Sequence, residues 1–151
     1  MRIQRTAFSC GPLAILNAAS ALGVRLTERE IRLHTGTTKK EGTNSFGMLS
    51  ALERLGFEFR QTNDHKHAAF HTLLESIVEG YVGVLCVEEG NHWIAAVGVV
   101  GSRIVTFDSW NSAKNKSECG IDVLDQKQLM RWWSHGPANE YYGILFRKAG
   151  A

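Results

Sequence analysis

The first half of the chain carries apolar residues at helical spacing, separated by polar caps and by glycines that end helices. Met48, Leu49, Leu52 and Leu55 form the clearest apolar stripe. A capping box that begins at Thr27 marks the start of another helix. The pattern therefore predicts four helices, over residues 11–22, 28–34, 46–55 and 70–78, with a short strand at 57–61 and polar loops at 37–44 and 63–67.

The second half carries continuous runs of β-branched and apolar residues instead. They predict strands at residues 81–87, 92–100, 103–108 and 141–147, with a turn at 88–91 and a tight hairpin turn at Gly101-Ser102. The polar stretch 109–118 is expected to be an exposed loop, and Asp125 to cap a last helix that reaches residue 133. Helices followed by an antiparallel meander indicate an α+β fold. We expect one domain, 1–151, with a mainly helical part at 1–80 and a mainly antiparallel sheet part at 81–151.

Composition and charge narrow the functional classes. The 151 residues are 44% hydrophobic and 21% charged, and the net charge of +2 comes from scattered basic residues, so nucleic acid is not an expected partner. No apolar run approaches the roughly 18 residues of a membrane-spanning helix, so no membrane partner is expected either. The N-terminal apolar run superficially resembles a secretory signal, but Asn17 and the Cys-Gly-Pro break inside it argue against one.

The three cysteines cannot all pair with one another, and they lack metal-ligand spacing. This predicts a reducing, cytoplasmic location with no metal. Cys86 lies in an apolar run and is expected to be a small core residue, whereas the polar surroundings of Cys119 indicate nothing. The cluster of His65, His67 and His71 matches no standard zinc motif. Trp132 and Trp133 are expected to pack a helix on the sheet. A binding site for a partner protein would be indicated only if one of these tryptophans were exposed. The sequence does not indicate an oligomeric state.

Cys10 has the surroundings of a nucleophile. It stands before Gly11-Pro12 at the start of the first predicted helix, where Pro is favoured in the first turn. The free N–H groups and the dipole of a helix N-terminus stabilise a thiolate. Gln4, six residues earlier, offers a side-chain N–H that can form an oxyanion hole with the Cys10 backbone N–H.

A cysteine nucleophile needs a base and a group that orients the base. His92 opens an apolar strand directly after a turn, which places it at the rim of a sheet. Asp108 closes the next strand, and the hairpin turn between them brings both residues to the same end of the hairpin. The alternatives are a structural cysteine, a strand-end histidine held by its neighbours, and a turn-initiating aspartate.

These residues resemble the papain-like cysteine peptidases. Gln4 and Cys10-Gly11 follow the Gln-x5-Cys-Gly pattern, and Asp108-Ser109-Trp110 is similar to the Asn-Ser-Trp of papain. The 16-residue spacing from His92 to Asp108 resembles in particular the bacteriocin-processing peptidases that cut after double-glycine leaders. The similarity spans residues 4–108, and we expect a stand-alone domain without an attached transporter segment. Ser9 and Ser109 differ from the residues usual in those leader peptidases, Asp and Pro, so the leader substrate is left open.

The resemblance implies a papain-like α+β fold whose helical part carries Cys10 and whose sheet carries His92 and Asp108. It also implies a bacterial peptidase that needs no cofactor and forms an acyl-enzyme on a peptide or protein substrate. Cys10 would attack, His92 would act as base and acid, Asp108 would orient His92, and Gln4 would hold the oxyanion. We expect the substrate to be bound by Thr43, Asn44, Asn91 and Trp110. The same triad would also serve a transglutaminase-like acyl transferase, and the same scaffold a non-catalytic peptide-binding module.

Overall fold

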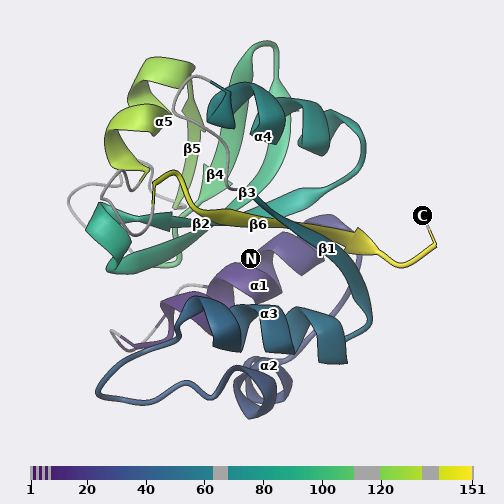
Figure 1. Ribbon diagram of the computed structural model, residues 1–151, viewed down its shortest axis with the longest axis vertical. Coiled ribbons are helices and arrows are strands. Elements are labelled where there is room, and N and C mark those ends of the chain that lie inside the picture. Colours follow the sequence, from purple (N-terminus) through teal and green to yellow (C-terminus); the bar gives the residue numbers. More distant parts are fainter. Residues whose placement is uncertain are drawn as a thin grey trace.

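A computed structural model of the chain contains one antiparallel sheet of six strands with helices on both faces (Figure 1). The structure describes residues 2, 4, 6, 8–62, 68–110, 120–133 and 140–150. Helices α1, α2 and α3 lie on one side of the sheet, and α4 and α5 lie on the other (Figure 1). The predicted α+β fold is therefore confirmed.

Helix α1 (Cys10–Ala21) is the centre of the first half, and ten of its twelve residues are buried. It is apolar on all sides because it is enclosed between the sheet and the helices α2 (Glu28–Thr35) and α3 (Ser45–Arg54). The capping box of Thr27 with Glu30 starts α2, as predicted. The side chain of Asn44 caps α3 by accepting a hydrogen bond from the backbone N–H of Gly47.

The sheet has the strand order β1-β6-β2-β3-β4-β5, and all neighbouring strands are antiparallel. The strands are β1 (Phe57–Thr62), β2 (Val82–Val87), β3 (His92–Val100), β4 (Arg103–Phe107), β5 (Ile121–Leu124) and β6 (Gly143–Lys148). A short 3-10 turn, η1 (Glu88–Gly90), joins β2 to β3. The helices of this half are α4 (Ala69–Val78) and α5 (Gln126–Trp132), and a capping box of Asp125 with Gln128 starts α5.

Two features of the sheet differ from the sequence prediction. Strand β5 was missed because it is a four-residue edge strand in which Ile121 and Val123 are each about 40% exposed. The simple meander was also wrong, because the C-terminal strand β6 inserts between β1 and β2. It thereby joins the single strand of the first half to the sheet of the second half. The predicted loop 63–67 lies outside the described residues.

A β-bulge at Val97 sets the register between β3 and β4 (Arg103–Phe107). Val100 pairs with Arg103 and Gly98 with Val105, but beyond the bulge Ala95 pairs with Phe107. Continuing this register places Asp108 opposite Ile94, which lies two residues from His92. Residues two apart on a strand share a face, so the bulge places Asp108 and His92 on the same face of the sheet.

The core has two parts, one on each face of the sheet. The first packs α1 and α3 against β2 and β3 and contains Cys86, which is buried as predicted. The second packs α4 and α5 against the opposite face. Trp133, which follows α5, is fully buried there and donates its indole N–H to the carbonyl of Tyr142, so this residue packs on the sheet as expected. Among the described residues, no helix combines the length and the apolar character needed to cross a membrane.

Candidate active site

Cys10 is the first residue of α1 and is 6% exposed. Ser9 precedes it as the N-cap residue but makes no side-chain capping bond to the helix. The backbone N–H of Cys10 is therefore one of the first-turn groups that have no acceptor within their own helix. The thiol thus lies at the N-terminus of a helix, as the sequence predicted.

His92 is the first residue of β3, and its ring is held between Cys10 and Asp108. Its Nε2 atom lies 2.6 Å from Oδ1 of Asp108, and the ring also shares a hydrogen bond with the Cys10 thiol. Because Nε2 is engaged by the carboxylate, the nitrogen left for the thiol is Nδ1. A carboxylate only accepts hydrogen bonds, so Nε2 carries a proton, and Nδ1 of the neutral ring is free to accept one.

Asp108 follows β4 directly and is buried, with 2% of its surface exposed. The same oxygen that accepts from His92 also accepts from the backbone N–H of Trp110 at 2.9 Å. This second bond fixes the carboxylate within its own turn. The ring of His92 is therefore oriented by a group that is itself held in place.

The electrostatic balance at His92 favours the imidazolium. Burial of the ring alone would lower its pKa, but the hydrogen bonds to Asp108 and Cys10 outweigh burial and raise the pKa of His92 from 6.5 to about 9. The charge of Asp108 acts in the same direction. Near neutral pH the site therefore contains a protonated ring beside the thiol.

Gln4 is buried and is anchored beside the Asp108 turn. Its backbone N–H donates to the carbonyl of Ser109 at 2.8 Å, and its side-chain Oε1 accepts from the Ser109 hydroxyl at 2.6 Å. Its Nε2 donates to the carbonyl of Thr6 at 2.8 Å. A second anchor lies further along the segment, where the side chain of Asn17 on α1 pairs with both backbone groups of Arg2.

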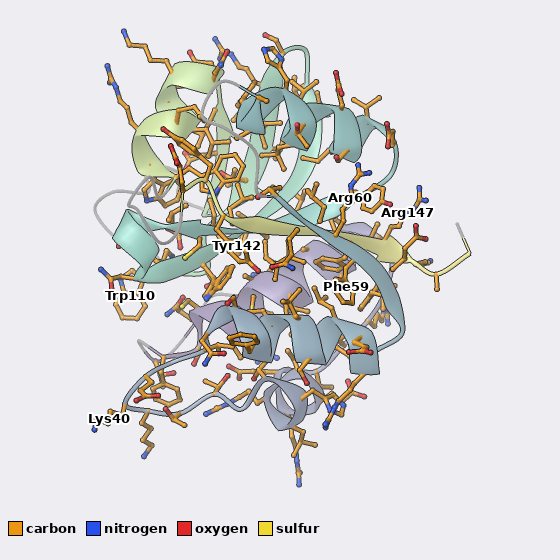
Figure 2. The ribbon with its side chains drawn as sticks, viewed as in Figure 1. Lys40, Phe59, Arg60, Trp110, Tyr142 and Arg147 are labelled. Carbon is orange, nitrogen blue, oxygen red and sulfur yellow. The ribbon has the colours of Figure 1, made fainter. Side chains whose placement is uncertain are left out.

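A cleft of about 240 Å³ opens beside Cys10. Figure 2 shows Lys40 and Trp110 on the left side of the view, away from Arg60 and Arg147 on the right. The residues that line the cleft come from the start of α1 and the segment before it, the loop after α2, and the strand β3 with the turn before it: Phe8, Cys10, Lys39, Lys40, Glu41, Gly42, Thr43, Gly90, Asn91 and Trp93.

Thr43 fixes the loop that forms one wall of this cleft. Its carbonyl accepts the indole N–H of Trp93 at 2.9 Å, and its hydroxyl bonds that of Thr37. The loop lies close to α1 because residue 11 is a glycine: a Cβ atom there would stand 2.7 Å from Cβ of Thr43. Gly11 therefore permits the approach of the loop to the N-terminus of α1.

The predicted substrate-binding residues are divided between the cleft and its surroundings. Thr43 and Asn91 line the cleft. Asn44 instead uses its side chain to cap α3, and Trp110, which is 40% exposed, is not among the lining residues. Substrate contacts of all four residues stay predictions.

Ser109 is the residue whose position the sequence prediction had wrong. It was assigned to an exposed loop, but it is 1% exposed because its hydroxyl and carbonyl both bind Gln4. The serine in the Asp-Ser-Trp pattern was the available signal. Cys119, His65 and His67 lie outside the described residues, and His71 is exposed on α4. Within the described ranges, no group of three or more His, Cys, Asp or Glu residues could hold a metal ion.

The chain resembles solved structures of peptidase domains over nearly its whole length. The peptidase domain of Streptococcus ComA, a bifunctional ABC transporter involved in quorum sensing, has a TM-score of 0.73 at 19% identity, over 97% of this chain and 96% of that one. A double glycine motif protease from an AMS/PCAT transporter, in complex with its leader peptide, has a TM-score of 0.71 at 14% identity, over 97% and 89%. A putative C39-like peptidase from Bacillus anthracis has a TM-score of 0.67 at 10% identity, over 100% and 96%.

Comparison of the sequence alone identifies no related protein. No family model matches the chain, and no curated protein matches it. The likeness is therefore one of fold, as the sequence motifs predicted. The chain has the papain-like α+β fold of C39 peptidase domains.

Proposed function

We propose that this protein is a cysteine peptidase that hydrolyses a peptide or isopeptide bond. The observation that carries the proposal is the hydrogen-bonded series Cys10–His92–Asp108, in a chain with the fold of cysteine peptidase domains. A buried thiol beside a protonated imidazole, itself held by a buried carboxylate, is the arrangement that activates a cysteine nucleophile.

The reaction follows from the proton positions. The Cys10 thiolate attacks the carbonyl carbon, and the negative charge that develops on the carbonyl oxygen is stabilised by the Cys10 backbone N–H and by Nε2–H of Gln4. The imidazolium of His92 then donates its Nδ1 proton to the leaving amine as the C–N bond breaks, which leaves a thioester. Water attacks the thioester while His92 takes its proton, and the acid is released with the thiol restored.

The substrate is proposed to be an extended segment of a peptide or protein. The cleft beside Cys10 is lined by the loop after α2 and by the turn before β3, and a similar protease has been captured with a leader peptide bound. The thiol must stay reduced for the reaction, so a reducing, cytoplasmic location is part of the proposal. Whether the bond cut follows two glycines is left to experiment.

A cleavage profile tests the proposal. The protein is incubated with a peptide library derived from a bacterial proteome, and new N-termini are identified by mass spectrometry. We expect a defined set of cleavages that Cys10→Ala abolishes and Asp108→Ala greatly weakens. The variant Cys86→Ala is the matched control, because it removes the other described buried thiol outside the site. Products that form only when an amine is added would indicate an acyl transferase. The absence of any Cys10-dependent product would refute catalysis.

A further inference from the structure

Ser109 takes no part in the reaction proposed above, yet it is almost fully buried beside the reacting groups. It follows Asp108 directly, and its hydroxyl lies 2.6 Å from Oε1 of Gln4. Its backbone carbonyl accepts a second bond from the Gln4 N–H at 2.8 Å. A buried hydroxyl aimed at the side chain of a neighbouring segment requires an explanation beyond the geometry of a turn.

The direction of these bonds is determined by the Thr6 carbonyl. A carbonyl oxygen can only accept, so the end of the Gln4 carboxamide that faces Thr6 must be Nε2. The opposite end, Oε1, therefore faces Ser109, and the serine hydroxyl must be the donor. Ser109 and Thr6 together select one of the two orientations of the amide.

We propose that Ser109 is a positioning residue that holds the Gln4 carboxamide with its N–H toward the oxyanion. The inference rests on the proposed function, because it gives Gln4 its role there. One proton of Nε2 is committed to Thr6, and the second is the one that would meet the oxyanion. If the amide turned over, Oε1 would face the developing negative charge and repel it, so the orientation decides whether Gln4 helps or hinders.

One short turn then controls both halves of the site. Asp108 orients the base, and the next residue orients the oxyanion donor. A purely structural role for Ser109, to fasten the N-terminal segment, is separable from this one. The backbone bond from Gln4 N–H to the Ser109 carbonyl survives when the hydroxyl is removed, and Asn17 holds Arg2 independently.

The test compares two reactions of Cys10. Acylation by p-nitrophenyl acetate passes through an oxyanion, whereas alkylation by iodoacetamide does not, although both need the thiolate. In Ser109→Ala we expect acylation to fall about tenfold, the value of one hydrogen bond, with alkylation unchanged. Gln4→Ala should slow acylation by about a hundredfold, and the double variant should be no slower than Gln4→Ala, because both changes remove the same donor.

Ser109→Thr, which keeps the hydroxyl, should restore acylation, and Ser76→Ala, which removes a hydroxyl equally buried on α4, should leave both rates unchanged. The inference is overturned if Ser109→Ala acylates like the parent protein, if alkylation falls as far as acylation, or if the losses of Ser109→Ala and Gln4→Ala multiply. If Cys10 of the parent protein reacts with neither reagent, the proposed function fails instead.

Discussion

Replacing Asp108 by asparagine separates the charge of this side chain from its geometry. The Asp108 oxygen that binds His92 also accepts the N–H of Trp110, so an asparagine at this position must point its carbonyl oxygen the same way to keep both bonds. The proton on Nε2 of His92 is retained, and only the negative charge is lost. Asp108→Asn is therefore expected to preserve the tautomer of the ring while lowering the pKa of His92.

The size of the effect follows from the pKa of His92. Raising it from 6.5 to about 9 corresponds, at about 1.4 kcal/mol for each pH unit, to about 3 kcal/mol in favour of the imidazolium, net of burial. Without the charge, the pKa of His92 should fall below about 9, because one of the contributions that raise it is lost while burial still disfavours the cation. At about pH 7.5 nearly all molecules of the parent protein have a protonated ring, and this fraction should be smaller in Asp108→Asn.

Two measurements follow this change. NMR of the His92 ring carbon as pH is varied should give a midpoint near 9 in the parent protein and a clearly lower midpoint in Asp108→Asn. Alkylation of Cys10 by iodoacetamide near neutral pH should slow by about tenfold, because the thiolate loses its cationic partner. Asp125→Asn is the matched control, since it removes an equal charge at the start of α5, and it should change neither result.

The reasoning would be refuted by an Asp108→Asn variant whose His92 still titrates near 9. The reasoning would also be refuted if Cys10 kept its reactivity while the ring midpoint fell, because the imidazolium would then not stabilise the thiolate. A further variant, Asp108→Ala, removes the geometry as well as the charge. It should therefore cost more activity than Asp108→Asn, and equal losses would show that orientation contributes nothing.

Three other outcomes are expected. Protonation of His92 stabilises the fold fully below pH 6.5, and this stabilisation is lost as pH rises through about 9. Urea unfolding should therefore show the free energy of unfolding falling between these pH values, and His92→Gln should remove this pH dependence. Gly11→Ala places a methyl group 2.7 Å from Thr43 and should cost about 1–3 kcal/mol in the same assay, whereas Gly98→Ala, which meets nothing closer than 3.8 Å, should cost less. Trp93→Phe breaks the bond to the Thr43 carbonyl and should raise KM more than it lowers kcat; an effect on kcat alone would contradict a role in shaping the cleft.

Local signals in the sequence were sufficient for the helices and for most strands. The capping boxes at Thr27 and Asp125 mark the starts of their helices, and β3 matches its predicted span from His92 to Val100. These features depend on neighbouring residues. The place of β6 between β1 and β2 depends on contacts between distant segments, which no local pattern contains. Strand β5 alternates between exposed and half-buried residues, so its apolar signal was too weak.

The residues of the candidate site could be predicted from the sequence, but the hydrogen bonds that hold them in place could not. Cys10, His92 and Asp108 carry motifs, and the structure brings them into one hydrogen-bonded series. Their roles stay proposals. The support of Gln4 by Ser109 joins residues 105 positions apart, and a serine in a polar run gives no sign of burial. Such contacts become visible only when the fold brings the two segments together.

The bulge at Val97 shifts the register of the β3–β4 hairpin by one residue, and this shift decides which face Asp108 points to. Without it, Asp108 would lie opposite Ala95 rather than Ile94, and it would point to the face opposite His92. The pairing of acid and base therefore depends on the register between β3 and β4 more than on the identity of the bulged residue. Substitutions at position 97 should be accepted readily. Deleting that single residue would make the ladder regular, with Ala96 still opposite Thr106 and Gly98 opposite Val105, so Asp108 should stay opposite Ile94 and on the face of His92. A related chain with the same His-to-Asp spacing but a regular hairpin would carry the motif without the contact.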